Sequence, residues 1–135
     1  MNVSKVCNPA DIAVSGLRAQ SLRINVISTN IANASTTRTA AGEPYRRRDV
    51  VLGSATDALG GVDIVRVAAD MQTGFKRVYQ PGHPDADKDG FVLMPNVDLP
   101  VEMMHLVAAS RAYQANAAVL KRHQEIVNVT LELLR

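Results

Sequence analysis

The sequence predicts a mainly α-helical protein with a small β insertion. Two long stretches, one near each end of the chain, carry apolar residues at helical spacing. The middle holds most of the Gly and Pro residues together with short β-like runs. We therefore expect residues 1–37 and 98–135 to form one terminal domain, in which long helices pack as an antiparallel coiled coil. Residues 38–97 are expected to form a middle segment with a β-hairpin and loops.

The N-terminal helix is predicted between Asp11 and Ala34, a stretch that contains no Pro. Asn8 followed by Pro9 has the residue types of an N-cap and a first helical turn. Within the stretch, residues repeat at alternating steps of three and four, which is the spacing of a coiled-coil seam. The members of this seam are Ala10, Ala13, Leu17, Gln20, Ile24, Ile27, Ile31 and Ala34. The Ser- and Thr-rich residues 35–42 predict a loop after the helix.

The C-terminal helix is predicted to be longer. Asp98 is a candidate cap, and Pro100 fits the first turn. No further Pro follows, so one helix of roughly 35 residues, on the order of 50 Å long, is expected. Its predicted seam comprises Met103, Leu106, Ser110, Tyr113, Ala117, Leu120, Gln124, Val127, Leu131 and Leu134.

The middle segment contains four short runs typical of strands. They are Tyr45–Leu52, Val62–Ile64, Lys76–Tyr79 and Phe91–Met94, and the last two flank the turn-rich residues 81–90. One small antiparallel hairpin unit is the simplest arrangement of these runs.

Each terminal helix has a second apolar face. At about 100° per residue, Ile12, Ala19, Leu22 and Val26 lie away from the first seam, as do Ala112, Val119, Ile126 and Leu133 in the second helix. If each helix covers one face of the other, these two lines have no partner within the chain. Exposed apolar surface costs about 25 cal/mol per Å², or several kcal/mol per helix. Contiguous patches of this kind mark association sites, so the second faces predict contacts with neighbouring subunits.

The predicted assembly interface combines residues from both helices. Helical Asn residues are included in this interface because a buried amide can fix the register between helices. Solvent-facing or capping positions for these Asn residues are equally compatible with the sequence. The candidates are Ile12, Leu17, Ala19, Leu22, Ile24, Val26, Ile27, Asn30, Ile31, Asn33, Met103, Leu106, Tyr113, Asn116, Ala117, Val119, Leu120, Ile126, Val127, Leu131 and Leu134.

Composition and charge argue against several partner classes. The formal net charge of +2 is too small to indicate nucleic acid or an anionic membrane as the principal partner. No stretch reaches the roughly 18 apolar residues of a membrane-spanning helix. The first residues lack an apolar core before Asp11, so we expect no cleaved secretory signal. The single cysteine, Cys7, excludes an intrachain disulfide and is expected to be an inert thiol.

The sequence contains few residue patterns typical of a catalytic or metal-binding site. Asp85, Asp87 and Asp89, followed by Gly90, match the first half of a calcium-binding EF-hand loop. The second half fails, because the position of the bidentate Glu is occupied by Asn96. A hairpin turn built from Asp and Gly is therefore favoured over a metal site. The three His residues share no ligand spacing, and we expect no cofactor and no enzymatic activity.

The basic run from Arg46 to Arg48 has two interpretations. Charges at the start of a strand usually form a solvated edge that discourages pairing with other strands. The alternative is a contact with an acidic partner surface, and the sequence leaves both open.

Two motifs resemble those of bacterial flagellar rod and hook proteins. The N-terminal one comprises residues 15–19, Ser-Gly-Leu-Arg-Ala, with residues 28–36, Ser-Thr-Asn-Ile-Ala-Asn-Ala-Ser-Thr. The C-terminal one is residues 110–116, Ser-Arg-Ala-Tyr-Gln-Ala-Asn. Between them, residues 42–46, 79–84 and 94–98 are similar to those of one proximal-rod member of the family.

The resemblance implies a structural subunit of the proximal rod, part of the drive shaft that transmits torque from the rotor to the hook. It implies export through the flagellar type III apparatus without a cleaved signal peptide, and assembly in the basal body within the periplasm. The implied partners are copies of the chain, other rod proteins, the hook-basal-body adaptor protein and the rotor (MS) ring. A free-standing two-helix adaptor or export chaperone is the alternative, and a metal-dependent enzyme is a weaker one.

Overall fold

The computed structural model describes residues 8–55 and 60–134. Its internal contacts divide the chain into two compact units. Unit 1 comprises Met1–Ile24, Val50–Arg66 and Val107–Arg135, and unit 2 comprises Asn25–Asp49 and Val67–Leu106. Both long helices therefore contribute to both units, and the unit boundaries do not coincide with those expected at residues 37 and 98.

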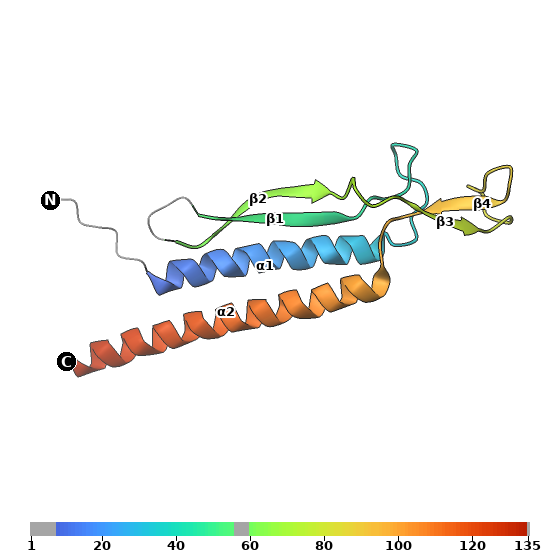
Figure 1. Ribbon diagram of the computed structural model, residues 1–135. Helices are drawn as coiled ribbons and strands as arrows, with labels where there is room; N and C mark the ends of the chain where they lie inside the picture. The colour runs from blue at the N-terminus through green and yellow to red at the C-terminus, as the bar shows by residue number, and fades with distance from the viewer. Residues whose placement is uncertain (1–7, 56–59, 135) are drawn as a thin grey trace. The chain divides into compact units, whose positions relative to one another are not determined.

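The N-terminal helix, α1, spans Pro9–Ala32 (Figure 1). Asn8 caps it, because the Asn8 Oδ1 atom accepts a hydrogen bond from the Ala10 N–H at 3.1 Å. The chain turns after Ala32 and continues as a loop. The predicted helix, its cap and the loop that follows are confirmed.

The C-terminal helix, α2, spans the 35 residues Leu99–Leu133, as predicted. The carbonyl oxygen of Asp98 accepts a hydrogen bond from the Glu102 N–H at 2.9 Å, which closes the first turn. In unit 1 the two helices run antiparallel. Gly16 lies against Asn116, and Pro9, earlier in α1, lines a hollow together with Val119 and Ile126, later in α2.

Four strands form two separate two-stranded sheets, where one hairpin unit was expected. The first sheet pairs β1, Arg48–Ser54, with β2, Val62–Ala69. The second pairs β3, Lys76–Tyr79, with β4, Phe91–Met94, in antiparallel register (Figure 1). Gly90 closes the β3–β4 connection with a φ of +79°, a left-handed conformation that favours glycine.

In unit 1 the second face of α1 already has a partner within the chain. The Ser15 hydroxyl oxygen accepts a hydrogen bond from the Val62 N–H at 3.1 Å, where β2 begins. Ala19, one turn further along the same face, is only 1% exposed. The expectation that this face lacks an internal partner is therefore wrong at Ala19, whereas Ile12 of the same face remains 40% exposed.

The side of α2 that faces α1 also differs from the predicted seam. Glu102 and Ala109 are buried, whereas Met103 and Tyr113 of the predicted seam are 57% and 40% exposed. The helix is turned so that Glu102 and Asn116, rather than the apolar residues beside them, meet α1. The polar pairing of Glu102 and the close approach of Asn116 to Gly16 thus set the face of α2 that meets α1, rather than the apolar periodicity.

Candidate assembly surface

Unit 2 is organised around the buried side chain of Asn30, on α1. Its Oδ1 atom accepts hydrogen bonds from the Tyr45 hydroxyl and from the Arg48 N–H, both at 2.9 Å. Its amide nitrogen donates to the Arg48 carbonyl oxygen at 2.8 Å and to Glu102 Oε2 at 3.0 Å. All four hydrogen-bonding positions of the amide are therefore used, which makes burial of this polar group stable. Of the two interpretations left open for the helical Asn residues, burial applies to Asn30.

Glu102 extends this network from α2. It is 1% exposed, and its Oε1 atom accepts a hydrogen bond from Arg47 Nε at 2.6 Å. Although burial acts to lower the pKa of the Arg47 guanidinium, the hydrogen bond and charge of Glu102 raise that pKa above its ordinary value. The Asn96 side-chain oxygen accepts a hydrogen bond from the Arg47 N–H at 2.7 Å. The network thus joins both helices of unit 2 to the chain that follows β4.

The basic run from Arg46 to Arg48 is mostly engaged within unit 2. Arg46 lies over the ring of Phe75 at 4.2 Å from the centroid. Arg48 lies near the ring of Tyr45, and Arg47 pairs with Glu102. Burial raises the pKa of the Tyr45 hydroxyl, which favours the protonated form that donates to Asn30. Neither of the two earlier interpretations describes Arg47, because its main partner is an internal carboxylate.

In unit 1 the helices approach closely where Gly16 faces Asn116. A β-carbon on Gly16 would stand 2.7 Å from Asn116 Nδ2 and 3.0 Å from Asn116 Cγ. A β-carbon essentially never approaches another atom to 2.7 Å, so a side chain at position 16 requires Asn116 to move. The glycine of the N-terminal motif and the asparagine of the C-terminal motif are therefore structural complements.

Gly16→Leu is expected to lower the free energy of unfolding by about 2 kcal/mol, because the larger side chain overpacks the contact with Asn116. Gly16→Ala should be nearly neutral, since alanine gains about 1 kcal/mol of helix propensity over glycine and Asn116 can rotate. Denaturant unfolding measures both values. Adding Asn116→Ala should recover much of the loss caused by Gly16→Leu. Wild-type stability in Gly16→Leu alone would show that the helices are not in close contact here.

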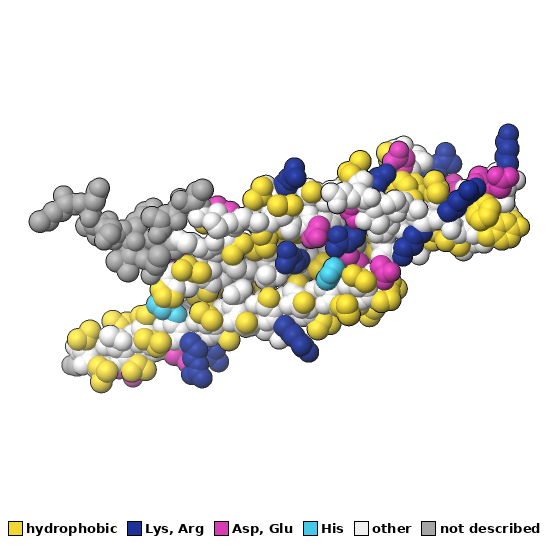
Figure 2. Space-filling view, in the orientation of Figure 1, with side chains coloured by type: hydrophobic (Ala, Val, Ile, Leu, Met, Phe, Trp, Pro, Cys, Tyr) yellow, Lys and Arg dark blue, Asp and Glu magenta, His cyan; other side chains and the backbone are white. Residues whose placement is uncertain are grey.

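The side of α2 that lines the hollow with Pro9 in unit 1 carries exposed apolar residues. Val119, Ile126 and Leu133 lie on one line along the helix and are 51%, 65% and 82% exposed. Figure 2 shows hydrophobic side chains along α2, with Lys and Arg side chains between them. Among the described residues, Val119, Ile126 and Leu133 of the predicted second face of α2 thus remain exposed, whereas Ala112, its fourth member, is half-buried.

The predicted interface residues fall into three groups by burial. Ala19, Ile27 and Asn30 are buried in the chain's own units, so they pack internally and do not offer a surface to a neighbour. A half-buried group lies at the margins of these units. It comprises Leu17, Leu22, Ile24, Val26, Ile31, Asn33, Leu106, Asn116, Ala117 and Leu120. The exposed group comprises Ile12, Met103, Tyr113, Val119, Ile126, Val127, Leu131 and Leu134.

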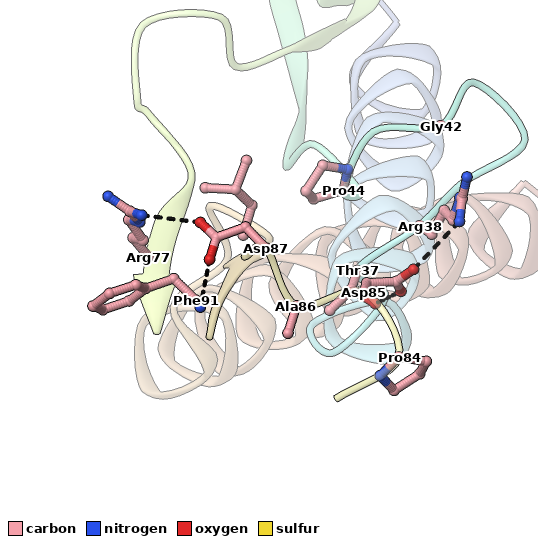
Figure 3. Close-up of a pocket in the computed structure, with 11 residues that line it drawn as sticks. Thr37, Arg38, Gly42, Pro44, Arg77, Pro84, Asp85, Ala86, Asp87 and Phe91 are labelled. Carbon is pink, nitrogen blue, oxygen red and sulfur yellow. Dashed lines mark hydrogen bonds and ion pairs between the residues drawn. The ribbon is translucent and has the colours of Figure 1, made fainter. Parts of the chain in front are cut away.

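The acidic turn between β3 and β4 borders an open hollow of about 660 Å³ in unit 2 (Figure 3). Asp85 accepts a hydrogen bond from the Thr37 hydroxyl at 2.8 Å and lies 3.5 Å from Arg38. Asp87 accepts a hydrogen bond from the Phe91 N–H, which lowers the pKa of this carboxyl, and pairs with Arg77 at 2.9 Å.

Asp89 lies 3.9 Å from Arg77. Asp85 is thus directed to Thr37 and Arg38, whereas Asp87 and Asp89 share Arg77. No metal-binding group of three His, Cys, Asp or Glu residues is found among residues 8–55 and 60–134. The same residues include no helix long and apolar enough to cross a membrane.

Sequence reasoning missed Tyr45, Arg47, Asn96 and Glu102 as members of one network. One available signal was Glu102 itself, a lone carboxylate one residue from the predicted seam of α2. Buried carboxylates require cationic or hydrogen-bonding partners, which Arg47 and Asn30 supply. The identity of these partners depends on contacts between residues 55 and 72 positions apart.

Comparison with known proteins connects these features to one family. Residues 11–38 match the model of the family described as flagella basal body rod protein. Residues 88–133 match the family described as flagellar basal body rod FlgEFG protein C-terminal. These matches cover both helices, including Gly16, Asn30, Glu102 and Asn116.

Individual relatives are similar over nearly the whole chain. The flagellar basal-body rod protein FlgC of Salmonella typhimurium strain LT2 is 44% identical over 129 residues, covering 93% of this chain and 96% of the relative. FlgC of Agrobacterium fabrum is 43% identical over 127 residues, covering 92% and 91%. FlgC of Bacillus subtilis strain 168 is 34% identical over 142 residues, covering 91% and 94%. The chain belongs to the FlgC family of flagellar basal-body rod proteins.

Proposed function

We propose that this chain is a structural subunit of the flagellar basal-body rod and assembles with copies of itself and with other rod components. The observation that carries the proposal is the apolar line of α2, Val119, Ile126 and Leu133, which the described residues leave exposed. Its members are spaced seven residues apart, so they lie on one side of the helix. A surface of this length and regularity fits another helix.

Burial of this line supplies the driving force for assembly. Apolar surface removed from water contributes about 25 cal/mol per Å². Val129 and Leu131 add further exposed apolar surface near the end of α2. Contiguous apolar surface on a folded chain marks an association site, and a rod built from packed helices offers such a site on each subunit.

The more specific role is that of a proximal-rod subunit in the shaft that transmits torque from rotor to hook. Its neighbours are other rod proteins, the hook-basal-body adaptor protein and the rotor (MS) ring. It reaches the periplasm through the flagellar export apparatus without a cleaved signal peptide. Family membership over nearly the whole chain favours this role over a free-standing adaptor, an export chaperone or a metal-dependent enzyme.

The residues proposed to contact neighbouring subunits are those that the chain leaves exposed or half-buried. On α2 these are chiefly Val119, Ile126, Val127, Leu131 and Leu134. On α1 the candidate with the most exposed apolar side chain is Ile12, at 40%. The internally packed Ala19, Ile27 and Asn30 support these surfaces from within and are not themselves proposed as contacts.

Deletion of the chain's gene in the source bacterium tests the role. We expect the mutant to be non-motile, with basal bodies that lack a complete rod in electron micrographs, and to recover when the gene is restored. Basal bodies purified from the restored strain should contain the chain. Swimming mutants with normal rods, or basal bodies without the chain, would reject the proposal.

A further inference from the structure

A second stripe of exposed residues on α2 is arranged symmetrically about Ala118. It comprises Val107, Arg111, Ala118, Glu125 and Val129, all exposed and all in unit 1. At about 100° per residue these positions fall within roughly 40° of one another around the helix. They lie opposite the side of α2 that carries Ala109, Asn116 and Leu120, which are buried or half-buried. Most of the stripe is therefore directed away from α1 in this unit, and Ala118 at its centre borders the hollow that Pro9 also lines.

Residues at equal distances before and after Ala118 in the stripe are complementary in chemical type. Arg111 precedes Ala118 by seven residues, and Glu125 follows it by seven. Val107 and Val129 lie eleven residues before and after it. When two identical helices pack antiparallel around a common centre, residues equally distant from that centre face each other. Each valine would then meet the other valine, and each arginine would meet a glutamate.

The two charged side chains of the stripe can each form a further ion pair. The Arg111 guanidinium has no ion pair or hydrogen bond among the described residues. Glu125 Oε2 accepts a hydrogen bond from Arg122 at 3.1 Å, one turn earlier on the same helix, and its Oε1 atom has no partner in the described chain. The Glu125 carboxylate can therefore accept a second guanidinium without losing the first.

We propose that this stripe is the docking site for the same stripe of a second copy of the chain. The two α2 helices pack antiparallel about a two-fold axis at Ala118, and Arg111 of each copy pairs with Glu125 of the other. Such an interface is self-complementary, as two-fold symmetry requires. A parallel arrangement in the same register sets Arg111 against Arg111 and Glu125 against Glu125, and these like-charge contacts disfavour it relative to the antiparallel one.

This dimer goes beyond the proposed rod role, and of its residues only Val129 also belongs to the apolar surface proposed for rod assembly. The line through Val119, Ile126 and Leu133 lies about 80° around the helix from Ala118. The ion pairs of the dimer are exposed, and such pairs contribute little each. The dimer therefore forms as the concentration rises and dissociates on dilution, which leaves the chain free to enter a larger assembly.

Sedimentation equilibrium of the purified full-length chain over a wide concentration range tests the dimer. We expect a reversible monomer–dimer equilibrium. Arg111→Glu and Glu125→Arg should each weaken dimerisation by about tenfold, because each creates two like-charge contacts. The combined charge swap should return the dissociation constant close to that of the wild type. Arg66→Glu, on β2, changes the net charge as Arg111→Glu does and should have little effect.

Disulfide formation tests the symmetry directly. In a Cys7→Ser background, Ala118→Cys places two cysteines on the two-fold axis, within bonding distance of each other. Gln114→Cys places its two copies about 12 Å apart along the helices, at 1.5 Å per residue. Mild oxidation should therefore cross-link Ala118→Cys much faster than Gln114→Cys. Circular dichroism confirms that each variant retains its helices.

A chain that stays monomeric at all concentrations overturns the dimer, as does a charge swap that fails to restore it. Equal cross-linking at the two cysteine positions overturns the antiparallel two-fold arrangement. None of these results affects the proposed rod role, because that role is tested by motility and by the protein content of basal bodies. Conversely, if the chain dimerised in solution but were absent from basal bodies, the rod role alone would be rejected.

Discussion

Glu102→Ala is expected to lower the free energy of unfolding by about 3 kcal/mol, the largest stability effect of any single substitution considered. Removal of this carboxylate leaves the partly buried Arg47 guanidinium without its closest anion. The Asn30 amide nitrogen loses one of its two acceptors at the same time. Buried polar groups that lose their partners carry the full cost of desolvation. Denaturant unfolding of purified protein measures the loss.

Two companion variants distinguish this network from a general effect of removing charge. Glu132→Ala removes a carboxylate from the exposed end of the same helix and should change stability by less than about 0.5 kcal/mol. Arg47→Met combined with Glu102→Leu replaces the ion pair by apolar groups and should recover part of the loss. If Glu102→Ala were as stable as Glu132→Ala, the buried network would have no energetic importance.

Ile126→Asp is expected to abolish motility while leaving the isolated chain folded. Ile126 is 65% exposed, so a carboxylate at this position remains hydrated in the free chain. In an assembled rod the same carboxylate would be buried against a neighbouring helix without a partner, which is strongly unfavourable. The expected result is a non-motile strain whose basal bodies contain no complete rod, together with wild-type helicity by circular dichroism.

Asn128→Asp is the matched control for Ile126→Asp, because it introduces the same carboxylate two residues away. Asn128 is exposed and polar, and it points to a different side of the helix. We expect strains with this substitution to swim. Motility with normal rods in the Ile126→Asp strain would reject the assembly surface proposed for α2.

The local elements were predictable because their signals lie close together in sequence. The cap at Asn8, the start of α2 after Asp98, and the exact bounds of β3 and β4 followed from residue types and periodicity. The exposed apolar line of α2 also followed, because Val119, Ile126 and Leu133 repeat every seven residues and the described residues leave them exposed.

Contacts distant in sequence were not predictable in the same way. Periodicity placed Met103 and Tyr113 toward α1, whereas the helix is turned to bring Glu102 to Asn30. The amphipathic pattern records which residues are apolar, but it does not record that one glutamate has an arginine partner 55 positions earlier. Likewise, no local signal indicates that Ser15 contacts β2 and so helps to cover the second face of α1.

The burial of the α2 surface on assembly can be measured directly by cysteine labelling. In a Cys7→Ser background, Ile126→Cys places a thiol on the exposed apolar line, in a conservative apolar position. A maleimide reagent should label this thiol rapidly in the purified chain. In basal bodies isolated from motile cells, labelling should be strongly slowed, because a neighbouring helix covers the position. Equally rapid labelling in basal bodies and in the free chain would contradict the claim that assembly completes the packing of this helix.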